Sequence, residues 1–202
     1  MTSIFKYFQQ RGTMVELQLD PQKTALVLID LQNAIVGMTP APHSADKVVE
    51  NSVKLANAFR AKGAPVVYVR VDLSDFLNLP VDQPFNLGDK PLPAVASEIA
   101  PSAGFQPGDI LVTKRHWGAF AATDLEQQLK SRGIDTVVLT GISTNAGVES
   151  TARQGTGLGF GFVLVEDACS SQNAEHHRFA FENIFPRLTR VRSTDEVLAA
   201  LA

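Results

Sequence analysis

Five short runs of apolar, mostly β-branched residues recur along the chain, and a stretch long enough for a helix separates each run from the next. The apolar residues are continuous rather than alternating, which is typical of strands that are covered on both faces. We therefore expect buried strands at 25–30, 65–70, 110–114, 136–141 and 160–165, and a weaker sixth strand at 189–192.

The stretches between these runs carry apolar residues at helical spacing. We expect helices at 45–61, 122–132, 146–158, 174–185 and 194–201. Alternation of strand and helix predicts a three-layer α/β/α fold of the Rossmann-like kind, with a parallel sheet of about six strands. The expected core order is second, first, third, fourth and fifth strand.

One long segment interrupts the alternation of strands and helices. Residues 72–109 are rich in Pro, Gly and Asp where a crossover helix would be expected. A loop of that length in a compact domain usually forms a lid, a binding wall or a subunit contact.

The length of 202 residues fits one domain. We expect that domain at 21–202, after a loosely held N-terminal extension at 1–20. Neither a run of about 20 apolar residues nor the apolar core of a secretory signal is visible, so we expect a cytoplasmic protein. A single cysteine, Cys169, excludes an intramolecular disulfide and a cysteine-based metal cluster.

The formal net charge is −3, and no basic run accompanies it. Nucleic acid and membrane surfaces are therefore not expected partners. A glycine-rich run at 155–161 precedes a strand instead of joining a strand to a helix, so it does not predict a dinucleotide site. We expect a small-molecule substrate and no cofactor.

Chemistry is expected where the strands end, because open parallel sheets bind ligands outside their carboxyl ends. Asp30 ends the first strand and Lys114 the third. In the expected order these two residues meet in one crevice. Each also has a purely structural interpretation: Asp30 as a helix cap, Lys114 as a solvated strand end, or the two as an ion pair.

The segment after the fourth strand supports the functional interpretation. Gly141 is followed by Ser143, Thr144 and Asn145, which suit a tight turn and a helix N-cap. Backbone N–H groups at such a helix start can hold an anion or a developing oxyanion. We expect this turn to be formed by Ile142, Ser143, Thr144, Asn145 and Ala146.

Several separated motifs then agree in type and spacing: ALVLIDLQ at 25–32, KRHWGAF at 114–120, TDL at 123–125, TGISTNAGVESTAR at 140–153 and EDA at 166–168. From about residue 24 to the C-terminus the chain resembles the isochorismatase-like hydrolases, also called the cysteine hydrolase or nicotinamidase superfamily. The segment 72–109 is the least family-like part.

The resemblance implies an Asp–Lys–Cys triad in amidase members, with the cysteine at the position of Gly147 and a non-proline cis peptide at Ile142–Ser143. Asp30 and Lys114 transfer to this sequence, but the nucleophile does not. Cys169 is expected on the order of 10 Å from the crevice, too far to replace it. Family members usually form dimers or larger assemblies, so we expect a homo-oligomer.

True isochorismatases resemble this chain in having glycine at that position, and they cleave a vinyl ether. The resemblance therefore implies acid-catalysed hydrolysis of a small carboxylated metabolite, with Asp30 as the acid and Lys114 as an electrostatic anchor. Asp30 would need a pKa about 3 units above its reference value of about 3.9. Desolvation must then outweigh the pairing with Lys114. The alternative is a catalytically silent binding or scaffold protein.

Gln32 is a further pocket candidate, as are Trp117 and Phe120, which follow Lys114 in the chain. For the two aromatic residues, packing in the core is the commoner alternative. Metal-binding amidases of the family show an Asp-x-His signature near the second strand, which residues 71–75 lack. His176 and His177 lie on a late helix. We therefore expect no metal.

Overall fold

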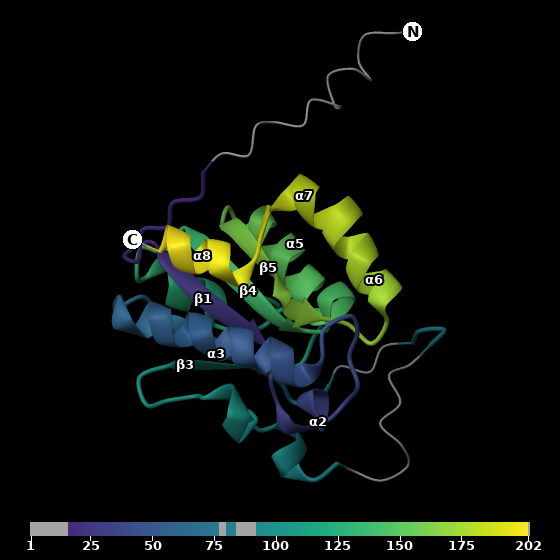
Figure 1. Cartoon of the computed structure of the whole chain (residues 1–202). Coiled ribbons are helices and arrows are strands. Elements are labelled where there is room, and N and C mark those ends of the chain that lie inside the picture. Colours follow the sequence, from purple (N-terminus) through teal and green to yellow (C-terminus); the bar gives the residue numbers. More distant parts are fainter. Residues whose placement is uncertain (1–15, 77–79, 84–91, 202) are drawn as a thin grey trace, which may run out of the picture.

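The computed structural model describes residues 16–76, 80–83 and 92–201 (Figure 1). One sheet contains six strands, β1 (Thr24–Ile29), β2 (Val66–Val71), β3 (Ile110–Lys114), β4 (Thr136–Ile142), β5 (Gly161–Ser170) and β6 (Arg190–Arg192). Every pair of neighbouring strands in this sheet is parallel. The predicted α/β class with a six-stranded parallel sheet is confirmed.

The strand order is β3-β2-β1-β4-β5-β6, so the predicted core order is wrong. β3 lies outside β2 at the edge of the sheet instead of beside β1. An apolar run identifies a strand but not the side on which the strand joins the sheet. The order therefore reverses between β1 and β4, where Ile29 is in register with Gly141.

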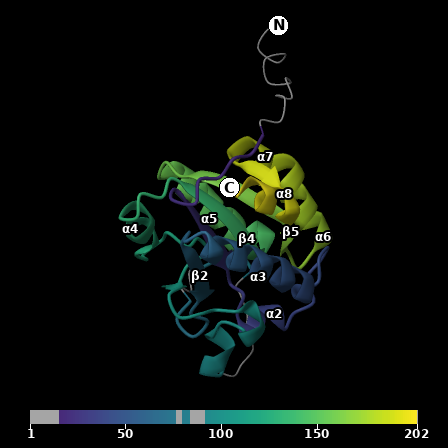
Figure 2. The ribbon, with the colours of Figure 1, turned by 60° about the vertical axis from the view of Figure 1, so that its left-hand side comes forward.

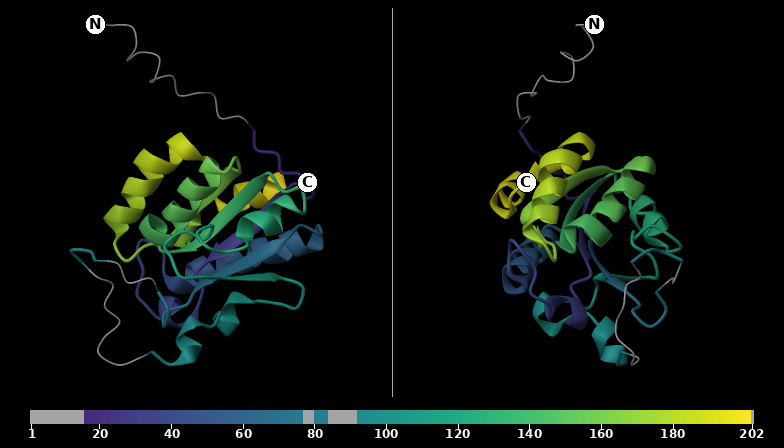
Figure 3. Two further views of the ribbon diagram at one scale, coloured as in Figure 1. Left: turned by 180° about the vertical axis from the view of Figure 1, so that it is seen from behind. Right: turned by 90° about the vertical axis from the view of Figure 1, so that its right-hand side faces the viewer.

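Helices cover both faces of the sheet, and the right-hand view of Figure 3 shows α3 and α5 on opposite sides of it. The helical elements are α2 (Asn33–Val36), α3 (Ala45–Ala61), η1 (Ala94–Ser97), η2 (Pro101–Ala103), α4 (Leu125–Lys130), η3 (Thr144–Val148), α5 (Glu149–Gly157), α6 (Ala174–Phe179), η4 (Ala180–Ile184), α7 (Phe185–Leu188) and α8 (Thr194–Ala200). None of these described helices is long and apolar enough to cross a membrane.

Two apolar cores lie between the layers. Leu26 and Leu28 of β1 point into the core under α3 and α8. Val27 and Ile29 point into the core under α4, α5 and α7. Successive side chains of a strand face opposite sides, so burial on both faces produces the continuous apolar run in the sequence.

Some boundaries differ from the predictions. β5 extends to Ser170, and α4 is shorter than the predicted 122–132 helix. The helical region predicted at 174–185 continues through α7 to Leu188. Of the expected N-terminal extension, residues 1–15 lie outside the described part of the chain. Leu17 and Leu19 are buried, and the Leu19 N–H donates to the Ala200 carbonyl. Residues 16–20 thus run beside the C-terminal end of the described chain (Figure 2).

Candidate active site

Asp30 and Lys114 lie together although β2 separates their strands. Lys114 is in register with Val71 of β2. Its side chain crosses the end of β2, and its Nζ donates to Asp30 Oδ2 at 2.8 Å. The same Nζ donates to the Trp117 carbonyl at 3.1 Å. The length of the lysine side chain thus brings together two residues that the strand order holds apart.

Burial dominates the electrostatics of Asp30. Its relative exposure is 6%, and that of Lys114 is 2%. Oδ1 of Asp30 is buried and has no hydrogen-bond partner among the described residues. Desolvation raises the pKa of Asp30 above its ordinary value, and the opposing attraction of Lys114 is smaller. The shift has the direction that an acid role requires.

The turn after β4 brings the backbone close to this pair. Ile142–Ser143 is a cis peptide, and η3 follows it. A Cβ at Gly147 would lie 3.0 Å from Asp30 Oδ2 and 3.4 Å from Lys114 Nζ. Any side chain at position 147 would therefore contact both charged groups, and glycine leaves that space free.

Gly141 lets β4 approach β1 closely. Its φ of 126° is one that side chains rarely adopt, and a Cβ there would lie 2.1 Å from the Ile29 carbonyl oxygen. The backbone N–H groups of Ala146 and Val148 both donate to the Ser143 carbonyl. An anion at this turn would have to use the other N–H groups.

A cavity of about 380 Å³ opens beside the pair, at the carboxyl ends of the strands. This volume is in the range of sites for small metabolites. Asp30, Lys114 and the turn at 142–147 line it, with Thr144 as the exception. The remaining lining consists of an apolar wall and several polar side chains: Ile35, Met38, Val71, Leu73, Phe76, Trp117, Gln83, Ser171, Gln172 and His176.

Three of the predicted residues do not line the cavity. Gln32 is buried and joins β1 to β2, because its Oε1 accepts from the Val71 N–H at 2.8 Å and its Nε2 donates to the Val71 carbonyl at 3.0 Å. Phe120 stacks on Phe160 in the core under α4 and α5. Thr144 is buried, with its Oγ1 2.9 Å from His177 Nδ1. Trp117, by contrast, lines the cavity.

Cys169 lies in the apolar core on the α4 and α5 side of the sheet and is fully buried. Its backbone is in register with Gly141 of β4. Desolvation raises the pKa of its thiol, which opposes formation of a thiolate. Cys169 is not among the residues that line the cavity.

A polar cluster behind the turn was not predicted. His177 Nε2 lies 2.9 Å from Glu166 Oε1, and His43 Nε2 lies 3.0 Å from the same oxygen. These hydrogen bonds hold the pKa of Glu166 at about 2, His177 contributing most. The EDA motif contains Glu166, but only the fold brings the two histidines to it.

Comparison with known proteins finds similar sequences and structures. The family model of the isochorismatase domain matches residues 24–196. The uncharacterized isochorismatase family protein YecD of Escherichia coli O157:H7 is 50% identical over 189 residues, which cover 92% of this chain and 100% of that protein. An isochorismatase family protein structure from Burkholderia thailandensis is 43% identical with a TM-score of 0.85, covering 93% of this chain and 99% of the other.

A relative of lower identity has an amide-cleaving activity in its name. The ureidoacrylate amidohydrolase RutB of Acinetobacter baylyi is 32% identical over 195 residues, which cover 83% of this chain and 79% of that protein.

Proposed function

The chain belongs to the isochorismatase family of hydrolases, and from this premise we propose that it hydrolyses a vinyl ether in a small carboxylated metabolite without a covalent enzyme intermediate. We further propose that it represents a branch of the family with glycine in place of the catalytic cysteine. In this proposal Asp30 is the acid, Lys114 the electrostatic anchor and the turn at 142–147 a source of backbone donors.

One observation carries the proposal. A buried carboxyl group with a raised pKa lines the cavity at the place where Gly147 provides no nucleophile. A carboxyl group whose pKa is raised by desolvation holds its proton to a higher pH and can then donate it, and a vinyl ether needs only a proton and water. A substrate carboxylate that pairs with Lys114 would weaken the attraction of Lys114 for Asp30 and raise the pKa of Asp30 further.

The reaction balances with these groups alone. Asp30 gives its proton to the terminal vinyl carbon, and the π electron pair forms the new C–H bond. Water adds to the oxocarbenium carbon and returns a proton to Asp30. The resulting hemiketal collapses to a ketone and an alcohol. For a vinyl ether that bears a carboxylate on the substituted carbon, the ketone is pyruvate.

Two other functions compete with this one. Amide hydrolysis through a thioester, as the amidase members of the family perform it, needs a thiol at position 147, and the thiol of Cys169 is buried in the core. A silent binding protein would keep the cavity but turn over no substrate. Substrate turnover therefore distinguishes the proposal from both.

The test is release of pyruvate from isochorismate by the purified protein, with a panel of amides as the comparison. We expect turnover that falls by about 100-fold or more in Asp30→Asn, since general acid catalysis typically contributes that much. Asp72→Asn is the matched control, because this carboxyl group follows β2 and does not line the cavity. Full activity in Asp30→Asn would end the proposal, and absence of turnover in the wild type would favour a silent protein.

A further inference from the structure

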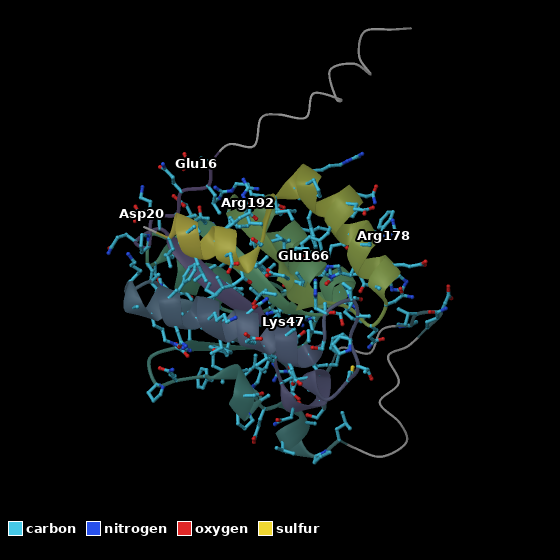
Figure 4. All side chains as sticks on the ribbon, in the orientation of Figure 1. Glu16, Asp20, Lys47, Glu166, Arg178 and Arg192 are labelled. Carbon is cyan, nitrogen blue, oxygen red and sulfur yellow. The ribbon has the colours of Figure 1, made fainter. Side chains whose placement is uncertain are left out.

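Two histidines and a glutamate from separate segments converge behind the active-site turn. His43 precedes α3, Glu166 is in β5, where Figure 4 labels it, and His177 is in α6. One side-chain N or O atom from each residue lies within 4.8 Å of the corresponding atom of the other two. All three atoms are of the types that bind transition metal ions.

The fold explains why these residues meet. β6 pairs with β5 only as far as Val165, so β5 continues past it without that neighbour. His43 reaches Glu166 from the segment before α3, where the Ser170 hydroxyl donates to the His43 carbonyl at 2.7 Å. His177 reaches it from α6. Both imidazoles are thus positioned by the surrounding chain before any ion binds.

The spacing of the three groups suits a small divalent cation. Glu166 Oε1 lies 2.9 Å and 3.0 Å from the Nε2 atoms of His177 and His43. Ligands about 2.0–2.1 Å from a tetrahedral zinc ion lie about 3.3 Å from one another. The two distances to Glu166 Oε1 would lengthen by a few tenths of an ångström around such an ion, and the ligand atoms of the two histidines already lie within 4.8 Å of each other. Two histidines and one glutamate are also a known zinc ligand set.

The cluster is accessible from solvent. The side chains of Glu166 and His43 are 40% and 26% exposed, whereas that of His177 is 3% exposed. A cavity of about 440 Å³ borders Glu166 and His177. An ion could enter from this side, and its fourth position would remain open to water or a small ligand.

We propose that His43, Glu166 and His177 form a binding site for a divalent transition metal ion of the zinc class. Thr144 completes the arrangement, because its Oγ1 lies 2.9 Å from Nδ1 of His177 and can accept a hydrogen bond from Nδ1–H. In that tautomer Nε2 carries no proton and is free to bind the ion. Thr144 belongs to the turn that ends at Gly147, so the ion would tie the active-site turn to β5 and α6. This site differs from the expectation of no metal.

The competing account is a hydrogen-bonded network without an ion, in which both imidazoles donate N–H groups to Glu166. Isothermal titration of the EDTA-treated, dialysed full-length protein with Zn²⁺ at pH 7.5 separates the two accounts. We expect one ion per chain. His43→Ala and Glu166→Gln should each weaken binding by roughly tenfold or more, as should Thr144→Val through the orientation of His177.

His176→Ala is the matched control, because His176 is exposed on the same helix and lies outside the cluster. It should bind Zn²⁺ like the wild type.

His43 and Glu166 are partly exposed, so their variants should fold, which circular dichroism checks. Absence of Zn²⁺ uptake by the wild type would overturn the proposal. Zn²⁺ binding that His43→Ala and Glu166→Gln both retain would also overturn it, as would loss of Zn²⁺ binding in His176→Ala. No substrate is involved, so the result is independent of the proposed reaction.

Discussion

Single residues determine how closely β1, β4 and the turn can approach one another. Asp30 leaves β1 with a φ of 55°, and Gly141 sits against the Ile29 carbonyl. Asp30 and Lys114 were recognisable from the sequence because each follows an apolar strand. Gln32 and Phe120 were placed in the pocket by proximity in the chain, but their side chains point into the sheet interface and the core.

Gly141→Ala should destabilise the domain by about 3 kcal/mol or more, since it combines an unfavourable φ with a backbone clash. Gly63→Ala is the matched control, because Gly63 also has a positive φ but a Cβ there would meet nothing within 4 Å. Urea unfolding measures both variants. Equal losses of stability in the two would contradict the close approach of β4 to β1.

Gly147→Cys should create a thiol that iodoacetamide modifies at least roughly tenfold faster than the thiol of Cys169. The new side chain would line the cavity beside Asp30 and Lys114, where a reagent can reach it, whereas Cys169 is fully buried. Mass spectrometry of the wild type and the variant over time gives both rates. Labelling of the variant no faster than that of the wild type would place Gly147 away from the cavity.

Whole helices and strands were predictable where the apolar residues are regularly spaced or a helix-capping residue is present. The predicted helix at 45–61 matches α3, whose Ser44 accepts a hydrogen bond from the Lys47 N–H. The strand order was not predictable, because β2 and β3 are joined by the segment 72–109, which has no regular period. The strand order shows that β3 lies at the edge of the sheet, and its Leu111 is exposed, at 41%.

The observed order predicts how amide hydrogens exchange. Backbone amides of β3 should exchange faster than those of β1, because β3 has a neighbour on one side only and β1 lies between β2 and β4. Hydrogen exchange followed by mass spectrometry of peptides resolves the strands. Protection of β3 equal to that of β1 would instead support the order in which β3 lies beside β1.

The complete fold buries the Asp30–Lys114 pair at the carboxyl ends of the strands, where the two side chains are 9% and 2% exposed. The raised pKa of Asp30 is a consequence of that enclosure. A carboxyl group with a higher pKa in the folded than in the unfolded chain contributes stability below the unfolded pKa and loses it as the pH rises through the folded pKa. No local sequence pattern predicts the shift, because its largest cause is desolvation by the complete fold.

The most direct test of the central claim is a ¹³C NMR titration of the Asp30 carboxyl carbon, identified by loss of its signal in Asp30→Asn. We predict a pKa above the ordinary value of 3.8 for Asp30. Asp72 serves as a reference in the same spectra, because the Ser74 hydroxyl that donates to its carboxylate lowers its pKa. A pKa of 3.8 or below for Asp30 would contradict its role as an acid.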